Sequence, residues 1–133
     1  MMAEKKRRFA LYAPEYLHAL GSKTANGLIL FRNDEVKVII DASKAGQTAQ
    51  DVLGYGGAIP IVAHVSEAMA FEPDTLVIGI APIGGAIKAT WIPELLLALQ
   101  ANIEVWAGLH QFLVNVDEFK PFEHLIWDVR KSP

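Results

Sequence analysis

The sequence predicts an α/β domain, namely a three-layer, doubly wound parallel sheet of five to six strands. Short apolar runs recur along the chain and leave room for a helix or turn between them. Most of these runs are continuously apolar, which is typical of parallel strands that are buried on both faces. The length of 133 residues fits one domain, and an apolar share of 52% is ample for its core.

Six apolar runs are the expected strands. They cover residues 8–12, 36–41, 59–62, 76–80, 103–107 and 125–129. Helix or turn signals separate them, so the connections should be right-handed crossovers between parallel strands. We expect the strand order 3-2-1-4-5, with the sixth strand beyond the fifth or at the edge.

Capping residues between these runs predict the helices. Ser22 is expected to cap a helix over 23–31, Ser66 a short helix through residue 71, and Thr90 a helix over 91–102. One or two helical turns are expected after Gly108. The glycines of 54–57 indicate a turn that needs positive φ angles.

Composition excludes several classes of function. The formal net charge is −3, without a basic excess, so nucleic acid is not expected as the main ligand. The absence of cysteine excludes disulfides, thiolate catalysis and cysteine-bound zinc, and it suits a cytoplasmic protein. No membrane span, metal-binding spacing or serine-nucleophile motif occurs. The high apolar share predicts a homo-oligomer or a further domain that covers apolar surface.

Ligands of open α/β sheets bind beyond the carboxyl ends of the strands, so the loops there are the candidate site. Lys23 and Thr24 follow the first strand at an expected helix N-terminus, which can hold a phosphate or carboxylate. The alternative is an ordinary cap with an exposed lysine. Asp41, at the end of the second strand, is expected either to bind a ribose or to cap the turn. Lys44 and Gly46 follow it in a small polar loop.

Two later loops add candidates. Pro82, Gly84 and Gly85 follow the fourth strand and would let a ligand approach the backbone, unless they form only a tight turn. Gly108 and His110 follow the fifth strand. His110 is a weak candidate for a catalytic acid or base, and the alternative is a histidine bonded to a loop carbonyl. Neither the dinucleotide fingerprint nor the P-loop pattern is present.

Several motifs in order carry a family resemblance, at residues 23–27, 40–46, 57–62, 79–85 and 108–113. The chain resembles the N-terminal Rossmann-like domain of the DgcN-type family, long catalogued as a domain of unknown function. Some members of that family are assigned as D-glutamate or other D-amino-acid N-acetyltransferases, and members usually carry a C-terminal P-loop domain. A more distant resemblance, at 59–62 and 65–68, is to the CoA-binding domain of succinyl-CoA-synthetase-type ligases.

The resemblance implies a Rossmann-like domain over 1–130, with 131–133 as the start of a linker to a P-loop domain that this chain lacks. It implies a module that binds a nucleotide, CoA or acetyl-CoA and is not active alone. The alternative is a structural or oligomerisation domain that has kept no ligand. A free-standing small enzyme is a third hypothesis, and it would depend on His110 together with Asp41 or Lys44.

Overall fold

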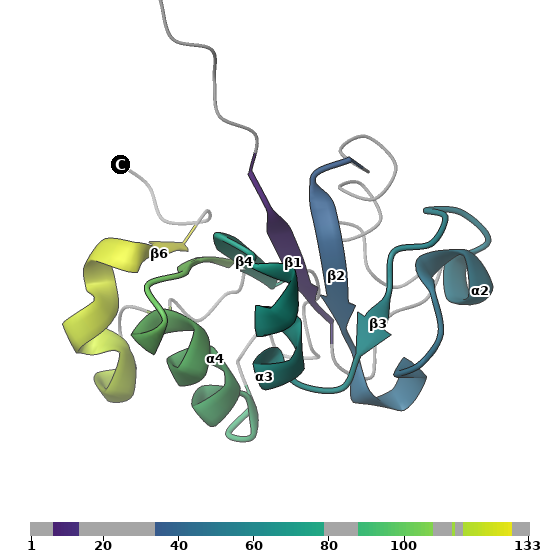
Figure 1. Cartoon of the computed structure of the whole chain (residues 1–133). Coiled ribbons are helices and arrows are strands. Elements are labelled where there is room, and N and C mark those ends of the chain that lie inside the picture. Colours follow the sequence, from purple (N-terminus) through teal and green to yellow (C-terminus); the bar gives the residue numbers. More distant parts are fainter. Residues whose placement is uncertain (1–6, 14–33, 79–87, 108–112, 114–115, 129–133) are drawn as a thin grey trace, which may run out of the picture.

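The sheet has six strands that all run parallel. The computed structural model describes residues 7–13, 34–78, 88–107, 113 and 116–128. Its strands are β1 (Phe9–Tyr12), β2 (Val36–Ile40), β3 (Ile61–Val62), β4 (Thr75–Ile78), β5 (Glu104–Ala107) and β6 (Ile126–Asp128) (Figure 1). Their order is β3-β2-β1-β4-β5-β6, and every pairing is parallel. The expected fold class, the six strands and their order are confirmed.

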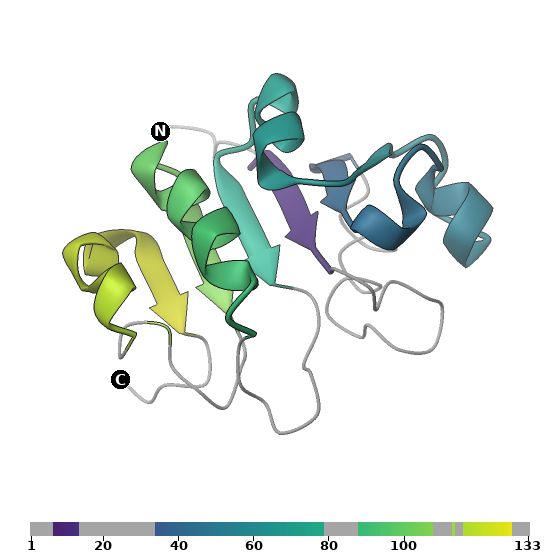
Figure 2. The ribbon, with the colours of Figure 1, turned by 90° about the horizontal axis from the view of Figure 1, so that it is seen from below.

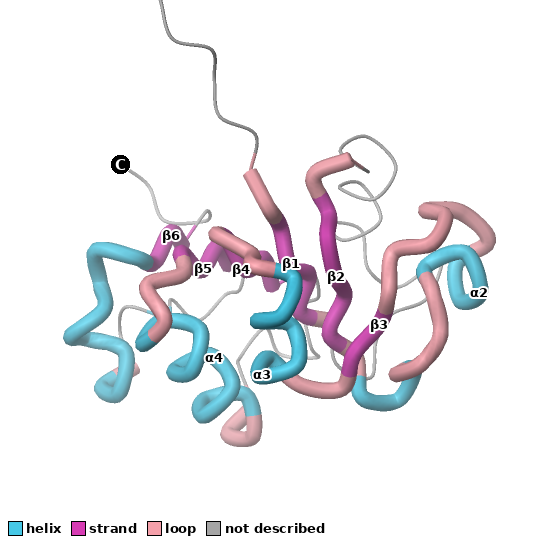
Figure 3. The backbone as a smooth tube through the Cα atoms, viewed as in Figure 1, coloured by secondary structure: helices cyan, strands magenta, loops and turns pink. Residues whose placement is uncertain are grey.

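The path of the chain creates a switch point in the middle of the sheet. The chain proceeds from β1 outward to β3, then returns to place β4 on the other side of β1 and continues outward to β6. The connections that leave β1 and β4 therefore diverge, which opens a crevice at the carboxyl ends of these strands. The parallel registers align the ends of β1, β4 and β5, and the strands lie side by side in the backbone trace (Figure 3).

The described helices gather mainly on one face of the sheet. These are α3 (Val65–Ala68), continued by η2 (Met69–Phe71), then α4 (Trp91–Gln100) and η4 (Asp117–Leu125) (Figure 2). Leu95, Ala98 and Leu99 of α4 are buried against the sheet. The helix ends two residues before the expected boundary because Asn102 adopts a left-handed φ of 66°. The expected helix over 23–31 lies outside the described residues.

The prediction that Ser66 caps the helix α3 is wrong. The helix begins at Val65, and His64 rather than Ser66 is its N-cap. Glu67, at the third helical position, accepts the backbone N–H groups of Ala63 and His64, both at 3.1 Å. This carboxylate satisfies two amides before the helix, so the helix starts earlier than a serine cap would allow.

Thr90 stands at the N-cap position of α4, as expected, but its side chain makes no capping hydrogen bond. Its backbone is already helical, with φ −66° and ψ −18°. A capping side chain needs an extended backbone at this position, so the threonine hydroxyl is not presented to the amides of the first turn.

Sequence reasoning did not predict the short helix α2 (Ala49–Leu53), which lies beyond β3 at the edge of the sheet (Figure 1). A reciprocal capping box starts it: the Asp51 N–H donates to Thr48 Oγ1 at 3.3 Å, and the Thr48 N–H donates to Asp51 Oδ2 at 3.0 Å. The helix ends at Gly54, whose φ is 82°. Gly56 and Gly57 also have positive φ angles, so the expected glycine turn is confirmed.

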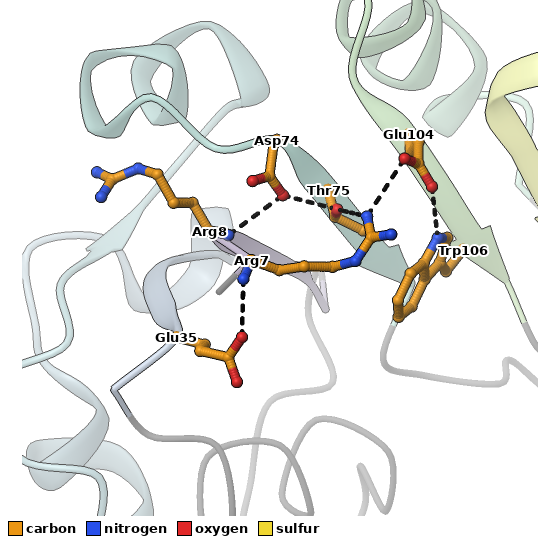
Figure 4. A network of polar contacts seen from close by, with 7 residues as sticks. All are labelled: Arg7, Arg8, Glu35, Asp74, Thr75, Glu104 and Trp106. Atoms are coloured by element: carbon orange, nitrogen blue, oxygen red, sulfur yellow. Dashed lines mark hydrogen bonds and ion pairs between the residues drawn. The ribbon is translucent and has the colours of Figure 1, made fainter. Parts of the chain in front are cut away.

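A polar cluster holds the amino-terminal edge of the sheet, opposite the switch-point crevice (Figure 4). The Arg7 guanidinium donates to Thr75 Oγ1 at 2.8 Å and to Glu104 Oε2 at 3.2 Å. It also lies 4.7 Å from the ring centroid of Trp106, whose indole N–H donates to Glu104 Oε1 at 3.2 Å. The Arg7 side chain, just before β1, therefore links β1 to β4 and β5. This polar cluster is separate from the residues at the carboxyl edge of the sheet.

Candidate functional site

A cleft of about 250 Å³ opens at the carboxyl edge of the sheet, where the switch point lies. Four separate segments line it. The lining residues are Tyr12 at the end of β1, Ala42 after β2, Ala63 and His64 after β3, and Thr90, Trp91 and Glu94 at the start of α4. The small side chains of Ala42 and Ala63 leave room beside the strand ends.

Two aromatic residues form the inner wall of the cleft. Tyr12 is the last residue of β1, and Trp91 is the first residue of α4. Their rings meet edge to face, with centroids 5.6 Å apart and an interplanar angle of 85°. Each residue is only 3% exposed, so the wall is a continuation of the core and is held rigidly.

Glu94 introduces a carboxylate into this apolar setting. From the first turn of α4 it reaches the first turn of α3, where its Oε1 accepts the Val65 N–H at 2.9 Å. The same oxygen lies 3.6 Å from His64 Nδ1, which is too long for a hydrogen bond and becomes an ion pair only when the imidazole is protonated. Since the Glu94 side chain is 23% exposed, its charge remains in contact with the cleft.

The Tyr12 hydroxyl is the second polar group at the inner wall. It makes no hydrogen bond to any described residue, and its oxygen is not sealed inside the core. Burial, and then the negative charge of Glu94, raise the pKa of Tyr12 well above its ordinary value of 10.0. The phenol is therefore neutral at physiological pH and can both donate and accept a hydrogen bond.

Four amide groups beside the cleft, those of His64, Val65, Trp91 and Ile92, already have acceptors in the protein. In α4 the Trp91 N–H donates to the Lys88 carbonyl at 2.9 Å and the Ile92 N–H to the Ala89 carbonyl at 3.2 Å. The third residue of α4, Pro93, has no N–H. The start of α3 is satisfied by two carboxylates, those of Glu67 and Glu94.

The structure describes three of the expected site residues, and none of them lines this cleft. Asp41 directly follows β2 and is fully buried. Its Oδ1 accepts the N–H of Ser43 at 3.0 Å and the Ser43 hydroxyl at 2.7 Å, which is the turn-capping geometry. Lys44 ends η1 (Ala42–Lys44) and is half-buried. Gly46 has a φ of 91° and donates its N–H to the Ile61 carbonyl at 3.0 Å.

The other expected site residues lie outside the described residues, so their roles remain predictions. They are Lys23, Thr24, Pro82, Gly84, Gly85, Gly108 and His110.

Sequence reasoning missed His64 and Glu94. The sequence held a signal for each. His64 follows closely after β3, and Glu94 lies in the first turn of α4, the helix that follows β4. Both positions face the carboxyl edge, where ligands bind. The two residues are thirty positions apart, so only the packing of α3 against α4 shows that they meet.

The described residues offer neither a metal site nor a membrane-spanning helix. They contain no cluster of three or more histidine, cysteine or acidic side chains that would hold a metal ion. No helix in the described part of the chain has the length and apolar character needed to cross a bilayer.

Comparisons with known proteins agree with this architecture. A crystal structure of a DUF1611 family protein from Anabaena variabilis ATCC 29413 superimposes with a TM-score of 0.85 at 36% sequence identity. The match covers 96% of this chain and 37% of that protein, so the chain spans little more than a third of this relative. No curated protein matches. A family model described as "Domain of unknown function (DUF1611_N) Rossmann-like domain" matches residues 42–132, and the chain therefore belongs to the DUF1611 family.

Proposed function

We propose that this chain is a ligand-binding Rossmann-like module, that its ligand is a nucleotide, CoA or acetyl-CoA, and that it is not active alone. The observation that carries the proposal is the cleft at the switch point, with walls from the ends of β1, β2 and β3 and the start of α4. This is where open α/β sheets bind their ligands, because the loops diverge there.

Two further observations support a module that works beside another domain. The chain covers 37% of the DUF1611 relative, which leaves most of that protein to other parts of its chain. The described residues of the cleft do not form a nucleophile and an oriented base, since His64 and Glu94 are too far apart to share a hydrogen bond. In this proposal the chemistry would lie in a C-terminal P-loop domain, as the resemblance to D-amino-acid N-acetyltransferases implies. In this proposal the domain covers 1–130 and the linker starts at 131.

The residues singled out from sequence have a place in this proposal. Lys23 and Thr24 would hold a phosphate group, and Pro82, Gly84 and Gly85 would let the ligand lie against the backbone. Lys44 would approach a ribose or adenine edge from η1. His110 would lie at the edge of the site, and no catalytic role is assigned to it.

A thermal-shift screen with CoA, acetyl-CoA, ATP, GTP, NAD and NADP tests the proposal. A ligand at 100 times its Kd adds about 2.7 kcal/mol of stability, which raises the Tm of a domain of this size by several degrees. The variant Ala63→Phe fills the cleft and should abolish the shift. The control Ala101→Phe adds the same side chain at the far end of α4 and should preserve it. If none of these compounds raises the Tm of the unmodified chain, the proposal is wrong.

An exposed tryptophan supports a second candidate function, a structural or oligomerisation domain. Trp127 on the edge strand β6 is 55% exposed and stacks edge to face on Trp106, with ring centroids 4.9 Å apart. Exposed tryptophans are enriched at protein interfaces. Sedimentation should then show a dimer or larger assembly that Trp127→Ser dissociates, and a monomer at every concentration would rule this out.

A further inference from the structure

We propose that the cleft takes the nucleoside part of the ligand, which is uncharged and donates hydrogen bonds, and that no phosphate group lies in it. This inference rests on the proposed function, which makes the ligand a nucleotide or a CoA compound. It assigns the site to Tyr12 and Glu94, neither of which stood out in the sequence.

Two hydrogen-bonding groups of the cleft are left unused by the described part of the protein. Glu94 has one oxygen bonded to the Val65 N–H, and its Oε2 makes no hydrogen bond to a described residue. The Tyr12 hydroxyl also makes no hydrogen bond to a described residue, although Tyr12 is only 3% exposed. Tyr12 is a buried residue whose hydroxyl opens onto the cleft, and the Glu94 carboxylate is 23% exposed there, so both groups are available to a ligand. A carboxylate oxygen and a neutral phenol suit ribose hydroxyls or a purine amino group.

The described walls of the cleft offer a phosphate neither a basic side chain nor a free amide group. Phosphates bind at helix starts through free amides or at lysine and arginine side chains. Among the described residues, the lining includes no lysine or arginine. The amides of His64 and Val65 are bonded to carboxylates, and those of Trp91 and Ile92 to carbonyls. The negative charge of Glu94 would also repel a phosphate in this half-enclosed space.

The cleft is too small to enclose a whole nucleotide or CoA molecule. Pockets that enclose a whole small-molecule ligand have volumes of roughly 300–1,000 Å³. The cleft, at about 250 Å³, is below that range and fits one part of a nucleotide or of CoA. The Tyr12 and Trp91 rings give it an apolar wall for a flat ring system. The phosphates would then extend outside the cleft.

The test uses the fluorescence of Trp91 as a local reporter. The chain has three tryptophans, so the double variant Trp106→Phe, Trp127→Phe leaves Trp91 as the only one. Adenosine, the nucleoside of CoA, ATP, NAD and NADP, should change the Trp91 emission in a saturable way. Inorganic pyrophosphate should neither change the emission nor compete with adenosine.

Variants then test the two assigned residues. Glu94→Gln keeps an oxygen for the Val65 N–H but removes the charge, and it should weaken adenosine binding about tenfold, as expected for one charge-assisted hydrogen bond. Tyr12→Phe should weaken it to a similar extent. Glu118→Gln, an exposed acid on η4, is the matched control and should bind adenosine as the parent does. Far-ultraviolet circular dichroism confirms that each variant is folded.

Failure of this inference differs from failure of the proposed function. If CoA or ATP raises the Tm but adenosine leaves Trp91 unchanged, or if pyrophosphate displaces adenosine, the assignment of the nucleoside to this cleft is wrong while the proposed function stands. If none of the screened compounds binds, both are wrong.

Discussion

The Glu94 carboxylate on α4 accepts the backbone N–H of Val65, the first residue of α3, at 2.9 Å. One helix thus supplies the cap for another that lies 29 positions earlier in the chain. The bond joins the segment after β3 to the segment after β4, across the crevice where the chain reverses its direction. The same side chain therefore has a structural role and places a charge in the cleft.

Removing this cap should destabilise the domain. Glu94→Ala leaves the Val65 N–H without its acceptor and should lower the free energy of unfolding by about 1 kcal/mol, as for other helix caps. Glu94→Gln retains an oxygen and should lower it less. Urea denaturation measures both. The exposed Glu123→Ala is the control and should have almost no effect, and equal losses for Glu94→Ala and Glu123→Ala would contradict the capping role.

Tyr12 should make stability fall at high pH. Its pKa is ordinarily 10.0 and is raised in the folded protein by burial and by Glu94. Between pH 10 and the folded pKa, the unfolded chain has lost the proton and the folded protein has not. Deprotonation therefore favours unfolding in this window, and stability falls by at most about 1.4 kcal/mol per pH unit from this group.

Urea denaturation at pH 8, 10 and 11 tests this. Tyr12→Phe should lose less stability between pH 8 and 11 than the unmodified chain, and the two should differ little in slope below pH 9. Identical pH profiles would show that Tyr12 is not shielded in the way described.

Gly54 should resist replacement by alanine but tolerate asparagine better. Its φ of 82° ends α2 in the left-handed region, where a Cβ costs about 1 kcal/mol. No atom lies within 4 Å of the site of an added Cβ, so backbone conformation and not crowding sets the cost. Thermal unfolding should rank the unmodified chain first, Gly54→Asn second and Gly54→Ala last. A Gly54→Ala protein as stable as the parent would contradict this conformation.

Arg7 and Trp106 should be energetically coupled. The guanidinium lies 4.7 Å from the indole centroid and also donates to Glu104. A double-mutant cycle of Arg7→Met and Trp106→Leu should give a coupling of about 0.5–1 kcal/mol, the usual value for a partly exposed cation–π contact. Urea denaturation of the four proteins measures it, and additive effects would show that the contact contributes nothing.

The strands were predictable because a strand buried on both faces needs a continuous apolar run, a pattern visible locally in residues such as 9–12 and 76–78. Their order followed because parallel strands need right-handed crossovers, which leave few topologies. The helix α2 was missed although Thr48 and Asp51 have the spacing of a capping box and Ala49 and Leu53 share one helical face, because five residues make little more than one turn.

The site was only partly predictable. The loops after the strands pointed to the carboxyl edge, where the cleft lies, and to Asp41, whose capping of Ser43 is seen. Sequence reasoning passed over Glu94, because a single acid in the first turn of a helix is ordinary in sequence. Its importance comes from its contact with Val65 and its position beside Tyr12.

By itself, the sequence determined the fold class and the strand order, because the apolar pattern and the handedness of crossovers are local properties. Only the tertiary structure decided which side chains share the cleft. Tyr12, His64 and Glu94 come from three separate segments, and their meeting depends on how α3 and α4 pack across the switch point. Local patterns do not encode that packing, since it arises from the fit of whole elements against one sheet.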